Sequence, residues 1–199
     1  MLQTALVTSG ATVPFPQLIS TVLDPLVLTK LRELGFSRLI VQYGKGFRRE
    51  FQEMLANASQ ASNVADTFLE CAALQRDAVD VAQCEGLQII GFALSGKIEQ
   101  IIVHEAQLII SHAGTGSILD ALRAHKRLVV VVNTSLMDNH QAEIADKFAA
   151  EGYLVSATAT VESVTQCLER VCHSDAPLRS FRSERSAPFQ QLLTELAFR

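Results

Sequence analysis

Short apolar runs alternate along the chain with longer stretches in which apolar residues recur every three or four positions. The short runs are typical of strands and the longer periodic stretches of helices. The run LVVVV at 128–132 is apolar throughout, which predicts a strand buried on both faces. Predicted strands lie at 2–7, 38–43, 87–90, 108–111, 128–132 and 153–156, and predicted helices at 15–34, 47–58, 96–105, 115–125, 138–151 and 160–172.

This alternation of strand and helix predicts an α/β fold with a parallel, doubly wound, Rossmann-like sheet and right-handed crossovers. Ligands of such sheets bind outside the carboxyl ends of the strands. Loops that follow a predicted strand are therefore the places to search for chemistry.

Two segments depart from the pattern. Residues 57–85 are polar and alanine-rich with little strand signal, which predicts an inserted helical or mobile segment. Residues 175–188 carry arginine, serine and proline, which suits a linker. An apolar stripe at helical spacing comes after this linker, formed by Phe189, Leu192, Leu193 and Leu196. The expected organisation is one domain over 1–174, with the insertion at 57–85, and a linker with an amphipathic helix over 175–199.

Composition narrows the class of protein. A chain of 199 residues with 48% hydrophobic residues is long enough for one full core. Its net charge of −4 gives no reason to expect a nucleic-acid partner. No apolar run approaches the ~18 residues of a membrane span. Four cysteines without metal-binding spacing and without a signal peptide favour reduced thiols and a cytoplasmic location.

The strongest candidate for chemistry is the stretch SHAGTGSILD, which lies between the predicted strand at 108–111 and the next helix. Gly114 and Gly116 let backbone come close to a ligand, and the helix that they open offers unpaired N–H groups to a diphosphate. Thr115 and Ser117 add hydroxyl groups. Asp120 lies one turn further on, where its carboxylate can accept hydrogen bonds from a ribose diol.

Plainer readings of the same residues stay open. A glycine pair in this position is often only structural, the hydroxyls can cap the helix, and Asp120 can be a solvated acid. Two sharper nucleotide motifs fail. A dinucleotide fingerprint needs a third glycine where Leu119 stands, and the P-loop-like GFALSGK lacks its Ser or Thr because Ile98 comes next.

Two further loops on the same sheet edge are rich in polar groups. Asp138, Asn139, His140 and Gln141 lie after the buried strand at 128–132, and their amide and imidazole groups can hydrogen-bond several sugar hydroxyls. Helix capping is the alternative role for this loop. The loop TSGAT at 8–12 lies after the first strand and is also rich in donors.

The stretches LVTSGATVPFPQLI, SHAGTGSILDALR and VNTSLMDNHQAEIADKFAAEGYL, in this order, resemble the family of catalytic subunits of the dolichol-linked UDP-N-acetylglucosamine transferase, above all its fungal members. The resemblance covers nearly the whole chain and is weakest at 57–85. More distantly, the chain is similar to the C-terminal half of the bacterial peptidoglycan GlcNAc transferase.

The resemblance implies the donor-binding half of a GT-B glycosyltransferase, with residues in specific roles. Gly114, Thr115, Gly116 and Ser117 would hold the diphosphate of UDP-GlcNAc and Asp120 the ribose. The sugar would meet the loop of Asn139, His140 and Gln141, the uracil would lie by Phe92, and Gly10, Ala11 and Thr12 would face the bond that breaks. His112 is a candidate general base only, since a partner can also supply the base.

The resemblance also implies a partner and a reaction. A membrane-anchored subunit on the cytosolic face of the endoplasmic reticulum would supply the acceptor half. The pair would transfer GlcNAc with inversion to GlcNAc-diphospho-dolichol, forming a β-1,4 link in N-glycan precursor synthesis. Without a DxD-like pair, we expect no metal and no other cofactor. One alternative is a non-catalytic nucleotide-sugar-binding subunit. The other is an NAD- or FAD-binding domain, but such a domain would need an acidic residue at the end of the second strand, where Gln42, Tyr43 and Gly44 stand.

Overall fold

A computed structural model describes residues 3–10, 14–58, 74, 79–133, 140–173 and 178–181. These residues form one seven-stranded sheet in the order β3-β4-β2-β1-β5-β6-β7. Every neighbouring pair is parallel except β3 and β4. The predicted doubly wound α/β fold is therefore confirmed. The strands are β1 (Thr4–Thr8), β2 (Arg38–Gln42), β3 (Val79–Cys84), β4 (Leu87–Phe92), β5 (Leu108–His112), β6 (Arg127–Val132) and β7 (Val155–Thr158).

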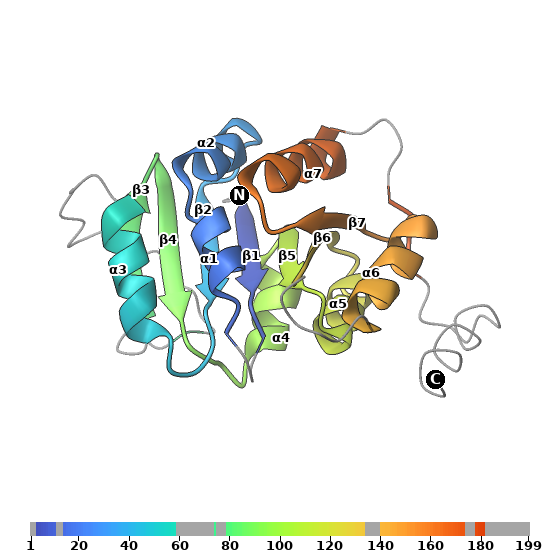
Figure 1. The fold of residues 1–199 in the computed structure, drawn as a ribbon, viewed down its shortest axis with the longest axis horizontal. Coiled ribbons are helices and arrows are strands. Elements are labelled where there is room, and N and C mark those ends of the chain that lie inside the picture. Colours follow the sequence, from blue (N-terminus) through green and yellow to red (C-terminus); the bar gives the residue numbers. More distant parts are fainter. Residues whose placement is uncertain are drawn as a thin grey trace.

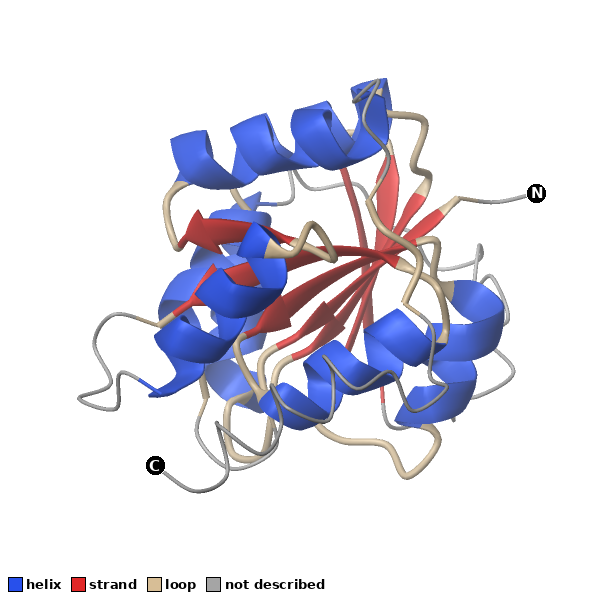
Figure 2. Cartoon of the chain, turned by 90° about the vertical axis from the view of Figure 1, so that its right-hand side faces the viewer, coloured by secondary structure: helices blue, strands red, loops and turns tan. Residues whose placement is uncertain are grey.

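Helices cover both faces of this sheet (Figures 1 and 2). One core layer packs α1, α2, α3 and α7 against the sheet, and the other packs α4, η2, α5 and α6 against the opposite face. The helices are α1 (Pro16–Val22), α2 (Pro25–Glu33), α3 (Arg48–Ala58), α4 (Ile98–Gln100), the π-helical turn η2 (Ile101–Glu105), α5 (Thr115–Arg123), α6 (His140–Ala150) and α7 (Val161–His173).

Strand β6 shows why its sequence is apolar throughout. Leu128 and Val130 face the core layer of α5 and α6, whereas Val129 and Val131 face the layer of α7. Successive side chains of a strand point to opposite faces, so a strand with helices on both sides needs apolar residues at every position. The prediction of a doubly buried strand is confirmed.

The helix predicted at 15–34 is two helices. Pro25 has no N–H and cannot continue α1, so the chain turns at Leu23 and Asp24. The Asp24 carboxylate then accepts a hydrogen bond from the N–H of Leu26 at 2.9 Å and caps α2. A proline at the first position of a helix is favourable, so the same residue ends α1 and begins α2.

Strand β3 corrects the prediction for 57–85. It pairs antiparallel with β4 through the two-residue turn Glu85-Gly86, whose φ angles of 49° and 78° are those of a type I′ hairpin. The strand lies at the sheet edge and its residues are mostly half-buried, which accounts for its weak strand signal. Residues 59–73 and 75–78 of the predicted insertion lie outside the described residues.

The Asp80 side chain connects the edge strand β3 to neighbouring parts of the fold through hydrogen bonds. Its carboxylate accepts hydrogen bonds from the Tyr43 hydroxyl at 3.0 Å, from Arg48 Nη2 at 3.0 Å and from Gln52 Nε2 at 2.8 Å. Burial and the nearby Asp80 carboxylate raise the pKa of Tyr43 to about 12. The phenol therefore remains a donor at neutral pH, and β3 is tied both to α3 and to the residue that directly succeeds β2.

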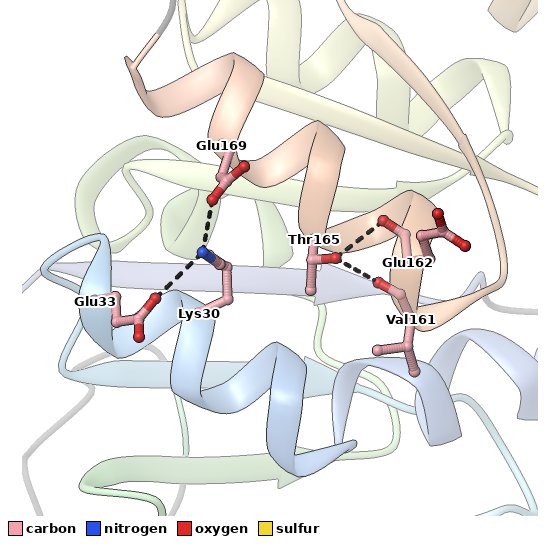
Figure 3. Close-up of polar contacts among 6 residues, drawn as sticks. All are labelled: Lys30, Glu33, Val161, Glu162, Thr165 and Glu169. Carbon is pink, nitrogen blue, oxygen red and sulfur yellow. Dashed lines mark hydrogen bonds and ion pairs between the residues drawn. The ribbon is translucent and has the colours of Figure 1, made fainter.

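Helix α7 is held to α2 across the outer surface of its layer (Figure 3). Lys30 Nζ lies 2.6 Å from Glu169 of α7 and 3.2 Å from Glu33 of its own helix. The two carboxylates raise the pKa of Lys30, and Lys30 lowers the pKa of Glu169. The Thr165 hydroxyl donates to the carbonyls of Val161 and Glu162 within α7. Because the ion pairs are exposed, buried apolar contacts rather than charge hold the two helices together.

The segment 178–181 carries the chain from the layer of α7 to the opposite one. Phe181 is buried among residues of the α5–α6 layer and meets the Tyr153 ring edge-on. The Arg179 N–H donates to Gly152 O at 2.9 Å, and its guanidinium pairs with Glu151 at 3.0 Å. The predicted linker therefore contains a core residue. The predicted C-terminal helix lies outside the described residues.

The described helices include none that is long and apolar enough to cross a membrane.

Candidate functional site at the carboxyl edge of the sheet

The loops after β1 and β5 meet at the edge of the sheet to which the parallel strands point, here called the carboxyl edge. Strand β5 pairs directly with β1, so Thr8 lies beside Ser111 although the two are 103 positions apart. The sheet order reverses between these strands, because β2 and β4 lie on one side and β6 and β7 on the other. Such a switch point is where open α/β sheets bind ligands.

His112 joins these two loops. Its Nδ1 lies 3.1 Å from the carbonyl oxygen of Thr8. Because a carbonyl oxygen can only accept, Nδ1 carries the hydrogen, and Nε2 is the unprotonated nitrogen of the neutral ring. Burial lowers the pKa of His112, so the ring is neutral at pH 7.

The imidazole lies against Gly10 and Gly114, and both glycines leave room for it. A Cβ added at Gly114 would lie 2.4 Å from His112 Nε2, and one added at Gly10 would lie 3.0 Å from the same atom. Gly10 also has a φ of 92°, which L-residues rarely adopt. The structural role of these two glycines is thus to admit the ring between the loops.

The hydroxyl groups near the strand ends are used inside the protein. Thr8 Oγ1 donates to Ser111 Oγ at 3.0 Å, and Ser111 Oγ donates to the carbonyl of His112 at 2.7 Å. Ser9 Oγ donates to the carbonyl of Gln42 at 2.8 Å. The donor-rich loop at 8–12 therefore uses its first two hydroxyls to brace strands, and Ala11 and Thr12 lie outside the described residues.

The beginning of α5 has the features of an anion site. Gly114 is the N-cap residue, and no side chain of the described residues caps this helix, so the hydroxyls of Thr115 and Ser117 do not satisfy its first N–H groups. The first turn also contains no acidic residue. Unpaired N–H groups and the helix dipole make this end attractive to a negative group.

Gly116 is exposed, and it differs from Gly114 in its surroundings. A Cβ at Gly116 would meet no atom of the described residues within 4 Å. No packing contact of the described residues therefore requires glycine here. Because glycine has no side chain, a ligand could approach the backbone closely at this position.

The other predicted site residues differ in how exposed their side chains are. Asp120 is half-exposed and lies 3.9 Å from Arg123 Nη1, which leaves its carboxylate open to solvent and to a ligand. The Phe92 side chain is 1% exposed in the core, so Phe92 can offer a ligand only its backbone. Residues His140 and Gln141 begin α6. Asn139 and the side chains of His140 and Gln141 lie outside the part of the chain that the structure describes.

The first glycine of the P-loop-like stretch at 91–97 has a structural role. Gly91 lies within β4, and a Cβ there would be 2.1 Å from Phe51 Cε1 of α3. Phosphate-binding glycines lie in the loop after a strand, not inside it. The rejection of this motif on sequence grounds agrees with its place in the sheet.

Sequence reasoning did not find the part that Thr8 and Ser111 play. Both look like ligand donors in the sequence, and only the pairing of β1 with β5 brings them to His112. The local pattern around either residue contains no information about a contact 103 positions away. Among the described residues, no group of three or more His, Cys, Asp or Glu side chains could hold a metal ion.

Comparison with known proteins identifies the family to which this α/β fold belongs. Residues 4–195 match the glycosyltransferase family 28 C-terminal domain. The chain is also similar to the solved structure of MurG from Acinetobacter baumannii, with a TM-score of 0.55 and 18% identity, covering 83% of this chain and 40% of that one. A rice protein, Os79, solved in complex with UDP, has a TM-score of 0.52 and 16% identity over 98% of this chain and 35% of its own. These two show the fold alone.

Nearer relatives are UDP-N-acetylglucosamine transferase subunits named ALG13. The one from Eremothecium gossypii is 44% identical over 99% of this chain and 94% of its own length, and the one from Saccharomyces cerevisiae is 39% identical over 96% and 95%. An NMR structure of an ALG13 has a TM-score of 0.70 and 38% identity, covering 98% of this chain and 96% of that one. The chain belongs to the glycosyltransferase family 28 C-terminal domain family and, within it, to the ALG13 subunits of UDP-N-acetylglucosamine transferase.

Proposed function

We propose that the chain binds UDP-GlcNAc at the carboxyl edge and is the catalytic subunit of a two-subunit N-acetylglucosaminyltransferase. The observation that carries the proposal is the uncapped beginning of α5, with open space over Gly116. The names of its relatives support the donor sugar and the existence of a partner. The proposed acceptor is GlcNAc-diphospho-dolichol, which receives the sugar with inversion and a β-1,4 link.

In this mechanism the protein acts on the leaving group. Negative charge grows on the β-phosphate as the bond to the sugar breaks. The N–H groups of Thr115, Gly116 and Ser117 stabilise that charge, because they are already oriented toward it and need no reorganisation. No metal ion is required for this role, and we propose that none takes part.

His112 is better suited to position the site than to take the acceptor proton. It is neutral at pH 7, as a base must be, but its ring lies against the backbone of Gly10 and Gly114. It thereby sets the spacing of the loop after β1 and the loop after β5. We therefore propose that the partner subunit supplies the base, together with the acceptor site and the attachment to the cytosolic face of the endoplasmic reticulum.

Asp120 provides the first test. Asp120→Ala should weaken the binding of both UDP and UDP-GlcNAc by about 1–3 kcal/mol, because a charged acceptor for the ribose hydroxyls is lost. Titration calorimetry measures both affinities. Arg123→Ala is the matched control, since it removes the neighbour of Asp120 without removing the carboxylate. If UDP affinity is unchanged in Asp120→Ala, the ribose contact is wrong.

Transfer itself separates the proposal from its main alternative. The chain alone should bind UDP-GlcNAc without transferring it, and transfer should appear when the co-expressed partner subunit and a lipid-diphosphate-GlcNAc acceptor are added. A non-catalytic nucleotide-sugar-binding subunit would bind in the same way, but Gly116→Ala in this chain would then leave the transfer rate of the complex unchanged. That result would contradict the catalytic role.

A further inference from the structure

A cavity lies at the opposite edge of the sheet from the donor site. It has a volume of about 370 Å³ and is lined by His125, Lys126, Arg127, Tyr153, Cys172 and Arg179, among others. Arg127 is the first residue of β6, and Tyr153 precedes β7, so the cavity lies where strands begin, here called the amino edge. A strand of six residues separates the two edges by about 20 Å.

Positive charge dominates the lining of this cavity. Lys126, Arg127 and Arg179 contribute three cations, and none of the described residues that line the cavity is acidic. Arg179 is partly neutralised by Glu151 at 3.0 Å. Among the described residues, no carboxylate lies within ion-pair distance of Lys126 or Arg127. Three cationic side chains around one cavity attract a negatively charged group.

Lys126 and Arg127 are each held in place by residues outside the cavity lining. Lys126 Nζ donates to the carbonyl of Val103 at 2.8 Å, which leaves two of its three N–H groups for other acceptors. Arg127 uses Nε on the carbonyl of Gln107 at 3.5 Å, and its guanidinium lies 5.6 Å from the centre of the Phe36 ring. Its terminal amino groups have no acceptor among the described residues. A fixed guanidinium with available terminal groups suits a planar or tetrahedral oxyanion.

The cations do not serve to cap α5. Three carbonyls near the end of that helix already have backbone donors, because Asp120 O accepts from Ala124 N at 3.1 Å, Ala121 O from Lys126 N at 3.0 Å and Leu122 O from His125 N at 3.0 Å. Arg127 also acts on the nearby Cys172. Burial raises the pKa of this thiol, and the positive charge of Arg127 opposes that rise. The Tyr153 ring, which carries the Arg179 guanidinium 5.4 Å from its centre, adds an aromatic surface.

We propose that this cavity binds a small free anion, a molecule that carries a phosphate, diphosphate or carboxylate group beside a flat or apolar portion. The oxyanion would lie between Lys126 and Arg127, and the apolar portion would lie on Tyr153. The volume is within the range of small-molecule sites, which begins at about 300 Å³. The site is separate from the donor site and does not depend on the proposed transferase activity.

Site-resolved NMR of the full chain tests the proposal, with inorganic pyrophosphate as the probe. The donor site is first saturated with UDP, because the α5 N-terminus would also attract a diphosphate. Saturable shifts are then expected in the amides of residues 125–127, 153 and 179. Shifts at 114–117 on adding UDP report the donor site separately, so failure of one site can be distinguished from failure of the other.

Arg127→Gln should weaken pyrophosphate binding at least tenfold, whereas Arg49→Gln, an exposed arginine on α3, should leave it unchanged. Lys126→Gln is the second variant, used if Arg127→Gln does not fold. Three results would overturn the proposal: no saturable shift at the amino edge, equal losses in the Arg49 control, or binding to anionic phospholipid vesicles without any binding of pyrophosphate. The last would identify a membrane surface instead of a small-molecule site.

Discussion

Gly114 and Gly116, the two glycines of the GTG stretch, serve opposite purposes at the donor site. Gly114 makes room for the His112 ring, whereas Gly116 faces open space. The sequence cannot show this difference, because both residues are simply glycine. The structure therefore assigns stability to the first glycine and ligand access to the second.

A pair of alanine variants tests this assignment. Gly116→Ala should leave the free energy of unfolding unchanged or raise it by up to ~1 kcal/mol, because alanine is the better helix former. Its UDP affinity should nevertheless fall, since the new methyl group occupies the approach to the helix end. Gly114→Ala should destabilise the fold by about 1–3 kcal/mol through its clash with His112. Urea unfolding and calorimetry measure the two effects, and equal stability losses in both variants would contradict the assignment.

The buried imidazole of His112 predicts a dependence of stability on pH. Its pKa is lower in the folded chain than the ordinary value of about 6.5, so the unfolded chain binds the proton more readily. The free energy of unfolding should accordingly fall as pH drops below about 6.5, until the folded-state pKa is reached. Urea unfolding at pH 7.5 and pH 5.5 measures the fall. His112→Gln should reduce it, and His104→Gln, which alters an exposed histidine, should not; identical slopes in all three proteins would exclude His112 as the source.

At the level of elements, the contact between α3 and β4 depends on one position. The Phe51 ring occupies the space where a side chain at 91 would be, and it also stacks on Tyr43 with ring centres 4.6 Å apart. Helix α3 thereby comes close to the sheet beside the edge strand β3. Any side chain at Gly91 would separate the helix from the strand.

Gly91→Ala should therefore lower the free energy of unfolding by about 1–3 kcal/mol, the usual cost of overpacking a core. Gly96→Ala, in the same GFALSGK stretch, should have little effect because no atom of the described part of the chain lies within 4 Å of its added Cβ. UDP affinity of folded protein should be unchanged in both variants. A large loss of UDP affinity in Gly96→Ala at unchanged stability would mean that this loop binds phosphate after all.

Elements with strong periodicity could be predicted from the sequence, and those set by context could not. Strands β5 and β6 and helix α5 agree with their predicted ranges to within two residues, because their apolar patterns are decisive. Strand β3 was missed because an edge strand needs no continuous apolar run, although the Glu85-Gly86 turn was a usable hairpin signal. The break before Pro25 was also visible, but the apolar periodicity continues across it and concealed the boundary.

The candidate site also contains some features that the sequence predicts and others that depend on the fold. The glycines, the beginning of the helix and Asp120 can be found from local sequence, since a strand, a glycine-rich turn and a helix in succession place them at the sheet edge. The lack of a cap cannot be found in this way, because Thr115 and Ser117 are hydroxyl residues of the kind that cap helices. The burial of Phe92 and the bracing by Thr8 and Ser111 depend on which strands are neighbours. Strand order is a property of the whole sheet, and the local pattern does not contain it.

At the scale of the whole molecule, Phe181 fixes the chain across the amino edge after α7 has ended. It is 4% exposed and belongs to the core layer of α5 and α6. The packed domain consequently continues beyond the boundary at 174 that the sequence predicts. The role of this anchor in stability can be tested separately from the role of the C-terminal residues.

Two variants separate the anchor from the C-terminal segment. Phe181→Ala should lower the free energy of unfolding by about 3–5 kcal/mol, as expected for a buried aromatic ring. Deleting Ser186–Arg199 should leave the domain folded and able to bind UDP, while it abolishes capture of the partner subunit. Urea unfolding, calorimetry and co-purification measure these properties. Capture at the wild-type level by the truncated chain would show that the apolar stripe at 189–196 does not dock on the partner.

The central place of β1 has a consequence for how the protein forms on the ribosome. Strand β1 is made before the other strands of the sheet, yet one of its two neighbours, β5, is made only when residues 108–112 are added. Pairing of β1 with β2 closes a short loop, but pairing with β5 closes a long one, which costs chain entropy before any new contact forms. During synthesis one side of β1 thus remains an unpaired edge until residue 112 has emerged. The nascent chain exposes that apolar edge until β5 has emerged, and chaperone dependence should be greatest in this interval.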